Sequence, residues 1–273
     1  MGDGKKRGKW VVVLHHTVRP RTCLYRVLEA LENATEERPF KIEVVVQGPS
    51  SDVPSLEGFL NDETIELVRV DNEENMGNGV PMSQAVDRFL KSDYRWFGRV
   101  DDDILVPPGA LDILEQCIVR TVESGYMVNR ATMATKNQRP RSIRVVSRQE
   151  AEPMLKLLTK RIETLTHDDV IYDVCDFTDI GCVLFDRAPL EEGCKPDPQF
   201  FVGCFSADWG WQAMQRGYKS ILCVKPRVDH IASQCKSGQH EVARRGVAGI
   251  RKAAFAFRDK WGVEPFGLTK YKR

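Results

Sequence analysis

Apolar and polar residues alternate in blocks along the first half of the chain. Four apolar runs typical of strands buried on both faces occupy residues 10–14, 40–46, 65–70 and 96–100. Between them, apolar residues recur at helical spacing within 24–31 and 82–89. Strands that alternate with helices predict βαβ units, hence an α/β fold with a mostly parallel sheet flanked by helices.

The second half is less regular. Helical spacing of apolar residues recurs within 111–122, 154–162 and 250–261, and buried strands are predicted near 181–187 and 218–224. A basic stretch between them, 129–147, shows neither period and is expected to be irregular.

Three consecutive carboxylates, Asp101, Asp102 and Asp103, follow the fourth apolar run directly. Adjacent acids repel one another, so their placement suggests a bound cation, and carboxylate oxygens suit Mg²⁺ or Mn²⁺. Ligands of open α/β sheets bind beyond the carboxyl ends of the strands, where this triplet would lie. The alternative is a solvated acidic turn that caps the helix starting near Pro108.

Bulk composition restricts the class of protein only loosely. The chain has 273 residues, a formal net charge of +1 and 42% hydrophobic residues, which suits one large domain with a full core. No apolar run approaches the ~20 residues that span a bilayer, and the basic start lacks the apolar stretch of a signal peptide. None of the eight cysteines forms a Cys-x-x-Cys pair, so we expect buried free thiols and a cytoplasmic protein.

Four stretches in order resemble the inverting GT-A glycosyltransferases of family two. They are residues 14–20 with the helix after them, Asn75-Met76-Gly77, Val100-Asp101-Asp102-Asp103 with Pro107-Pro108, and a late half running from Gly181 through Asp208 and Arg216-Gly217-Tyr218 to Val228-Asp229-His230. The resemblance covers about 10–230. It implies a GT-A fold, the Rossmann-like fold of nucleotide-diphospho-sugar transferases, over residues 9–235. This domain would consist of a nucleotide-sugar half (9–128) and an acceptor half (129–235). A basic helical extension (236–273) would follow it.

The resemblance also implies a nucleotide-diphosphate sugar as donor and a divalent metal, Mn²⁺ or Mg²⁺, as cofactor. Asp103 is then the direct metal ligand, Asp101 contacts the ribose or a metal-bound water, and His230 is a second metal or diphosphate ligand, unless it is an ordinary strand-end histidine. The residues expected to bind the nucleotide sugar are His15, Thr17, Arg19, Gln47, Asp52, Asn75, Gly77, Arg99, Asp101 and Asp102. Gln47 stands where the family often has an acid, so Asp52 is a candidate substitute. Arg99 would touch phosphate or form a surface salt bridge.

Asp208 matches the family's catalytic aspartate, although Ala207 replaces the usual preceding glutamate. The resemblance makes Asp208 the general base that removes the acceptor hydroxyl proton. Trp209 and Trp211 would desolvate Asp208 or form a platform for the acceptor. Asp179 is a further acceptor or donor-sugar contact, or a plain turn residue. The alternative is that Asp208 caps a helix and the tryptophans belong to the core.

Basic residues are segregated toward the expected acceptor side. Residues 129–149 contain six, Arg130, Lys136, Arg139, Arg141, Arg144 and Arg148, without an acid, and residues after 236 are also predominantly basic. This favours a polyanionic acceptor, and the alternative is a solvated basic surface. DNA that carries a hydroxymethylated base is the first candidate, by resemblance in role to the base-modifying glycosyltransferases of bacteriophages. The alternatives are a cell-surface polysaccharide or a lipid-linked glycan, and peripheral membrane contact stays open.

Two other classes of protein compete with this interpretation. A sugar-nucleotide pyrophosphorylase would carry a glycine-rich loop after the first strand, where this chain has His15-His16-Thr17-Val18-Arg19-Pro20. A non-catalytic polyanion-binding protein on a GT-A scaffold would not need Asp101, Asp103 and Asp208 together.

Overall fold

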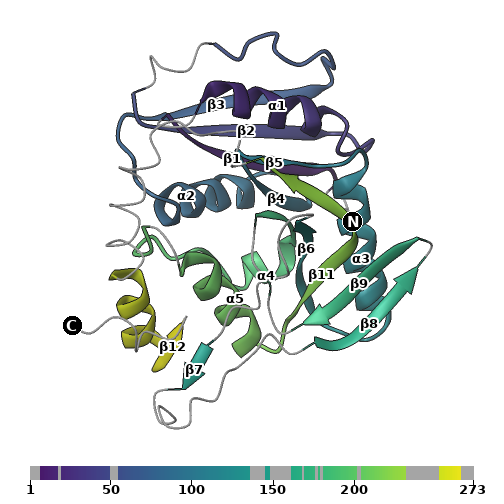
Figure 1. The fold of residues 1–273 in the computed structure, drawn as a ribbon, viewed down its shortest axis with the longest axis vertical. Coiled ribbons are helices and arrows are strands. Elements are labelled where there is room, and N and C mark those ends of the chain that lie inside the picture. Colours follow the sequence, from purple (N-terminus) through teal and green to yellow (C-terminus); the bar gives the residue numbers. More distant parts are fainter. Residues whose placement is uncertain are drawn as a thin grey trace, which may run out of the picture.

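The computed structural model describes residues 7–17, 20–49, 55–135, 145–147, 161–167, 169–175, 178, 181–201, 204–231 and 252–265 (Figure 1). The strands of the central sheet are β1 Lys9–His16, β2 Phe40–Gln47, β3 Ile65–Asn72, β4 Trp96–Asp101, β5 Ile104–Leu105, β6 Val128–Thr135, β8 Arg161–His167, β9 Val170–Cys175, β10 Cys182–Asp186 and β11 Lys219–His230. A separate pair is formed by β7 Val145–Ser147 and β12 Val263–Pro265. The helices are α1 Arg21–Glu32, α2 Gly79–Leu90, α3 Ala110–Glu123, α4 Arg187–Glu191, α5 Phe205–Gln215 and an unlabelled one at 252–261.

The sheet follows the order β3-β2-β1-β4-β10-β6-β11-β9-β8, and β5 pairs with β11. Its first four strands are parallel, as βαβ units require. Beyond β4 the pairs are antiparallel, except that β6 and β11 run parallel. The predicted α/β class is therefore confirmed, and the parallel arrangement belongs mainly to the first half of the chain.

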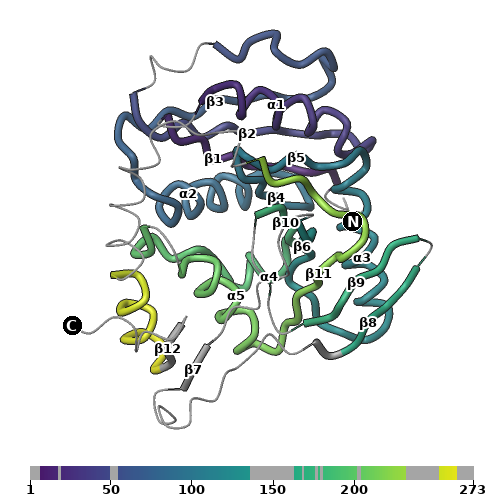
Figure 2. The backbone as a smooth tube through the Cα atoms, in the orientation of Figure 1, coloured from purple at the N-terminus to yellow at the C-terminus, as the bar shows by residue number. Residues whose placement is uncertain are grey.

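Two hydrophobic cores lie on opposite faces of the sheet, because successive side chains of a strand point to opposite faces. Val11 and Val13 of β1 pack with buried residues of α1 and α3. Trp10, Val12 and Leu14 pack with buried residues of α2, α5 and the 252–261 helix. In Figure 2 that last helix, drawn in yellow, lies next to α5.

Three sequence-based expectations need correction. The stretch expected to be irregular begins with a buried strand, β6. The helix expected over 154–162 is wrong at its end, because Arg161 and Ile162 belong to β8, while 154–160 lies outside the described residues. Six cysteines are buried free thiols as predicted, but Cys23 is disulfide-bonded.

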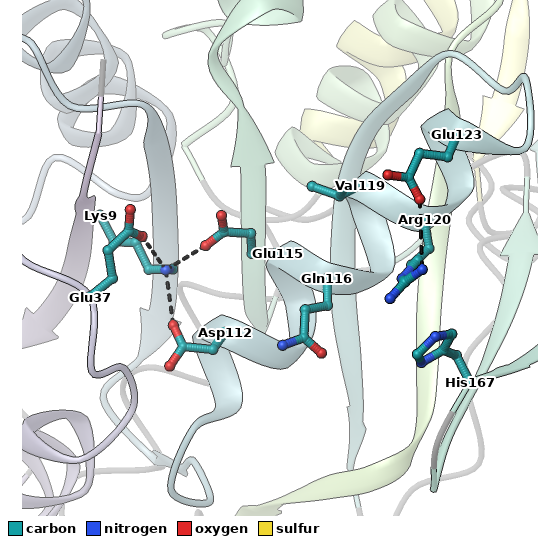
Figure 3. A pocket seen from close by; sticks show the side chains of 9 residues that line it. All are labelled: Lys9, Glu37, Asp112, Glu115, Gln116, Val119, Arg120, Glu123 and His167. Carbon is teal, nitrogen blue, oxygen red and sulfur yellow. Dashed lines mark hydrogen bonds and ion pairs between the residues drawn. The ribbon is translucent and has the colours of Figure 1, made fainter. Parts of the chain in front are cut away.

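Lys9 carries a buried charge at the amino-terminal end of β1, where its side chain is 1% exposed. Its Nζ lies 2.5 Å from Glu37 Oε2, 2.9 Å from Asp112 Oδ1 and 2.5 Å from Glu115 Oε2 (Figure 3). These ion pairs connect β1 with α3 and with the segment that follows α1. They lie at the end of the strand opposite to the acid triplet, so we assign this network to stability.

No helix in the described ranges combines the length and the apolar character that crossing a bilayer requires.

Candidate active site

Polar side chains meet at the carboxyl ends of the four parallel strands. His16, Gln47 and Asn72 stand side by side in the register of β1, β2 and β3, and Asp101 stands opposite Leu14. The strand order therefore brings the end of β4 next to the ends of the first three strands. This is the edge at which open α/β sheets bind ligands.

Each carboxylate of the triplet has a different partner. Asp101 forms an ion pair with the Arg99 guanidinium, which also lies 5.0 Å from the Phe205 ring. Asp102 Oδ2 lies 2.8 Å from His15 Nδ1, and both side chains are buried. The charge of Arg99 offsets part of the repulsion expected among three adjacent acids, and His15 gives Asp102 a polar partner. The solvated-cap alternative is wrong, because Asp102 and Asp103 are 2% and 3% exposed and α3 is capped by Gly109.

Asp103 faces His230 across the pairing of β5 with β11. Asp103 Oδ2 lies 3.4 Å from His230 Nε2, and the backbone N–H of Ile231 donates to the Asp103 carbonyl at 2.8 Å. A carboxylate oxygen and an imidazole nitrogen form a donor pair that suits Mn²⁺ better than Mg²⁺. Within the described residues no group of three or more His, Cys, Asp or Glu side chains could hold a metal ion. The metal-binding roles expected of Asp103 and His230 therefore stay predictions, which require further ligands from substrate phosphates and water.

Gln47 reaches from the end of β2 to the Asn75-Met76-Gly77 turn. Its Oε1 accepts from the Met76 N–H at 3.0 Å, and Asn75 Oδ1 accepts from the Gly77 N–H at 2.9 Å. Gly77 has a φ of +72°, and a Cβ there would lie 2.2 Å from the Phe201 carbonyl oxygen. The turn therefore needs glycine in order to pack against the segment that precedes α5.

Thr17, which directly follows β1, is hydrogen-bonded to the last residue of β2. Its backbone N–H donates to the Gln47 carbonyl at 3.1 Å, and its Oγ1 donates to the same oxygen at 3.3 Å. Three other residues expected at the site, Arg19, Asp52 and Asp179, lie outside the described residues.

Asp208 lies in the first turn of α5 and is fully buried. Its Oδ2 accepts from Gln212 Nε2 at 2.7 Å, and its Oδ1 accepts from Trp261 Nε1 at 2.6 Å and lies 2.9 Å from Lys260 Nζ. Burial raises the pKa of Asp208, and these three donors oppose that rise. Cys204 is the N-cap of α5, so the alternative that Asp208 caps the helix is wrong.

The two tryptophans beside Asp208 belong to the core. Trp209 is fully buried, its ring stacks on Phe185 at 4.0 Å, and its Nε1 donates to the Cys194 carbonyl at 2.7 Å. Trp211 is 7% exposed and meets Phe257 edge-on. Neither ring presents a face to solvent, so the interpretation of these rings as an acceptor platform is wrong for this structure. That these two rings desolvate Asp208 stays a prediction, because their contacts are with Phe185, Cys194 and Phe257.

Sequence reasoning missed Lys260, Trp261 and Asn72. Lys260 was counted with a basic surface, although its Nζ bridges Asp208 and Asp197. Arg130 was also assigned to a basic surface. It is fully buried in β6, where it donates to the Thr178 carbonyl at 2.5 Å. The other five basic residues of 129–149 lie outside the described residues.

Comparison with known proteins finds similarity at the level of structure. No family model matches the chain, and no curated protein matches it in sequence. Two crystal structures of S. aureus TarS, a GT-A glycosyltransferase, superpose on 96% of the chain. One has a TM-score of 0.55 with 11% identity, and the other, of TarS residues 1–349, has a TM-score of 0.52 with 13% identity.

The chain has a GT-A fold. It spans 44% of the first TarS chain and 73% of the second, so the correspondence is with part of each protein. At this level of identity the likeness concerns the fold, and the chemistry has to be argued from the residues of this chain.

Proposed function

We propose that this protein is a metal-dependent, inverting glycosyltransferase that uses a nucleotide-diphosphate sugar. One observation carries the proposal. Two buried nitrogen atoms at the carboxyl ends of adjacent parallel strands, Gln47 Nε2 and Asn72 Nδ2, have no hydrogen-bond partner among the described residues. Buried polar atoms are normally paired, so these mark a place where a polar ligand completes the structure.

The position of these atoms suits a nucleotide. Gln47 and Asn72 are neighbours on β2 and β3, and their amide nitrogens are donors that match carbonyl or ring-nitrogen acceptors of a base. The acid triplet at the end of β4 lies on the same edge, where the diphosphate would reach Asp103 and His230. A metal held by Asp103 and His230 would offset charge on the diphosphate.

Asp208 is the proposed general base. As the acceptor oxygen attacks the anomeric carbon, the bond from that carbon to the phosphate oxygen breaks and the electron pair leaves on the nucleoside diphosphate. The acceptor proton passes to Asp208. A carboxylate offers about four acceptor positions; donors from the described residues occupy two on Oδ1 and one on Oδ2, which leaves a position on Oδ2.

The acceptor is proposed to be a polyanion, with a hydroxymethylated base in DNA as the first candidate and a cell-surface or lipid-linked glycan as the second. The described basic residues lend this little support, because Arg130 and Lys260 point into the protein and Arg258 pairs with Asp259. The acceptor therefore has to be identified by experiment.

The test is to incubate the protein and Mn²⁺ with a panel of nucleotide sugars, offering hydroxymethylcytosine-containing duplex DNA and sugar-phosphate acceptors side by side. We expect release of a nucleoside diphosphate and addition of one sugar to an acceptor, read by mass spectrometry. Asp208→Asn should lose transfer, whereas Asp259→Asn, a control at an exposed aspartate, should not. Pyrophosphate exchange would indicate a pyrophosphorylase instead, and polyanion binding without turnover would indicate a binding protein.

A further inference from the structure

The 252–261 helix contributes two consecutive residues to the surroundings of Asp208. Trp261 Nε1 donates to Asp208 Oδ1 at 2.6 Å, and Lys260 Nζ lies 2.9 Å from the same oxygen. Both contacts join residues that are more than 50 positions apart in the sequence. They place this helix against the first turn of α5. Asp208 is fully buried, so these contacts and the one from Gln212 replace the solvation that the carboxylate would have in water.

Lys260 is itself held from several sides. Its Nζ also lies 2.7 Å from Asp197 Oδ2, and it lies 5.6 Å from the Phe200 ring and 5.0 Å from the Trp261 ring. The Lys260 side chain is 27% exposed, and Asp208 is completely covered. One ammonium group thus stands between two carboxylates, one of them reachable by water and the other enclosed.

We propose that Lys260 and Trp261 are positioning residues that fix the orientation of the Asp208 carboxylate and keep it ionised for proton transfer. The proposal rests on the assignment of Asp208 as general base. The arrangement has the features that such a role needs. The ammonium and the indole N–H both bind Oδ1, which leaves Oδ2 the less occupied oxygen, and the positive charge favours the anionic form of this buried carboxylate.

Among the described residues, few charged or titratable groups lie around Asp208. Lys260 faces it from the 252–261 helix, Asp197 acts through Lys260, and the Cys204 thiol lies at the start of α5. Burial and the charge of Asp208 raise the pKa of Cys204 to about 12, so this thiol stays neutral where the base works. Burial alone would lower the pKa of Lys260, but its contacts with Asp197 and Asp208 raise it, so Lys260 stays charged. Burial already raises the pKa of Asp208, and removal of the Lys260 charge would take away one of the contacts that oppose this rise.

The experiment follows the Trp261 indole N–H by NMR in protein labelled with ¹⁵N-tryptophan, assigned with Trp261→Phe. Because this group donates to Asp208, its resonance should shift with pH as Asp208 titrates, and Asp208→Asn should abolish that step. In Lys260→Met we expect the midpoint to rise by about one pH unit or more, the effect of an opposite charge at this distance. Lys260→Arg should stay near the wild type. Lys252→Met, at an exposed residue of the same helix, is the matched control and should leave the midpoint unchanged.

An unchanged midpoint in Lys260→Met, or a shift of equal size in Lys252→Met, would overturn the proposal. If Lys260→Met does not give a dispersed spectrum, Lys260→Gln keeps an N–H donor without the charge and should show the same upward shift. The acidic limb of the pH–rate profile should move by the same amount as the NMR midpoint. Absence of transfer by the wild-type protein with every donor would refute the proposed function, and the NMR titration would still decide the role of Lys260.

Discussion

Lys9 offers a sharp test of the energetics of this fold, because one buried ammonium is in contact with three carboxylates. The perturbation is Lys9→Met, which keeps the length of the side chain and removes its charge. Glu37, Asp112 and Glu115 would then face one another without a counter-charge, and their side chains are only 31%, 30% and 27% exposed.

Removing one partner of a buried ion pair destabilises a protein by about 3–5 kcal/mol. Water reaches roughly a third of each carboxylate here, so we discount this to about 2–4 kcal/mol in the free energy of unfolding at pH 7. The assay is urea unfolding followed by circular dichroism, extrapolated to water. Lys195→Met removes a pair with Asp87 whose side chains are 36% and 55% exposed, and this control should lose less than about 1 kcal/mol.

The pH dependence gives a second, independent criterion. The pKa of Lys9 is raised, because its contacts with three carboxylates outweigh burial, so its stabilisation is complete below the unfolded pKa and is lost as pH rises through the folded one. Burial would raise the pKa of Asp112, but its bonds from Thr35 and Lys9 lower it, so its stabilisation holds above the unfolded pKa and is lost as pH falls through the folded one. Burial raises the pKa of Glu115, so its ionised form destabilises the folded state, and this destabilisation decreases as pH falls and the carboxyl group is protonated.

In Lys9→Met the uncompensated acids become neutral as pH falls, so the difference in stability from the wild type should shrink between pH 7 and about 4. A variant as stable as the wild type at pH 7, or a difference that grows in acid, would refute this reasoning. Because the network lies at the opposite end of β1 from the acid triplet, donor binding at low temperature should be retained.

Three further predictions concern the site. Asp208→Asn should keep donor binding by calorimetry but lose transfer by roughly 10²-fold or more, and near-normal turnover would remove Asp208 from the chemistry. Asp103→Ala should abolish the metal-dependent part of donor binding, and an unchanged isotherm would contradict the metal assignment. Gly77→Ala should lower the free energy of unfolding by about 1–3 kcal/mol, because its Cβ would lie 2.2 Å from a carbonyl oxygen at positive φ; unchanged thermal stability would argue against this packing.

The parts of the fold that sequence predicts well are those in which local pattern and burial agree. The run at 10–14 is strand β1 and is buried throughout, and the apolar positions of 250–261 that are described do lie on a helix. Strand β6 was missed because Asn129, Arg130 and Thr132 break the apolar pattern. These polar side chains are buried, and each has a hydrogen-bond partner, Ser220 or Thr178, in a distant segment.

In the candidate site too, contacts between distant segments could not be predicted from the local sequence. The acid triplet was visible in the sequence because three acids after an apolar run are unusual. The environment of Asp208 was not, because Lys260 and Trp261 follow it by more than 50 positions, and their spacing along the chain carries no sign of the contact. A lysine in a basic segment looks the same whether it faces water or a buried carboxylate.

The first strand of the sheet order, β3, has a consequence for the behaviour of the protein in concentrated solution. Among the described strands β3 lies at an edge of the sheet, and an edge strand offers backbone groups to which another chain could add a strand. β3 carries Glu66, Arg69 and Asp71, and the pairs Lys41–Glu66 and Arg69–Asp71 place fixed charges along this edge. Docking a second strand there would require these charges to lose their water. The edge is therefore protected against the sheet-to-sheet addition that leads to aggregation, and neutral substitutions at these positions should make the protein more prone to it.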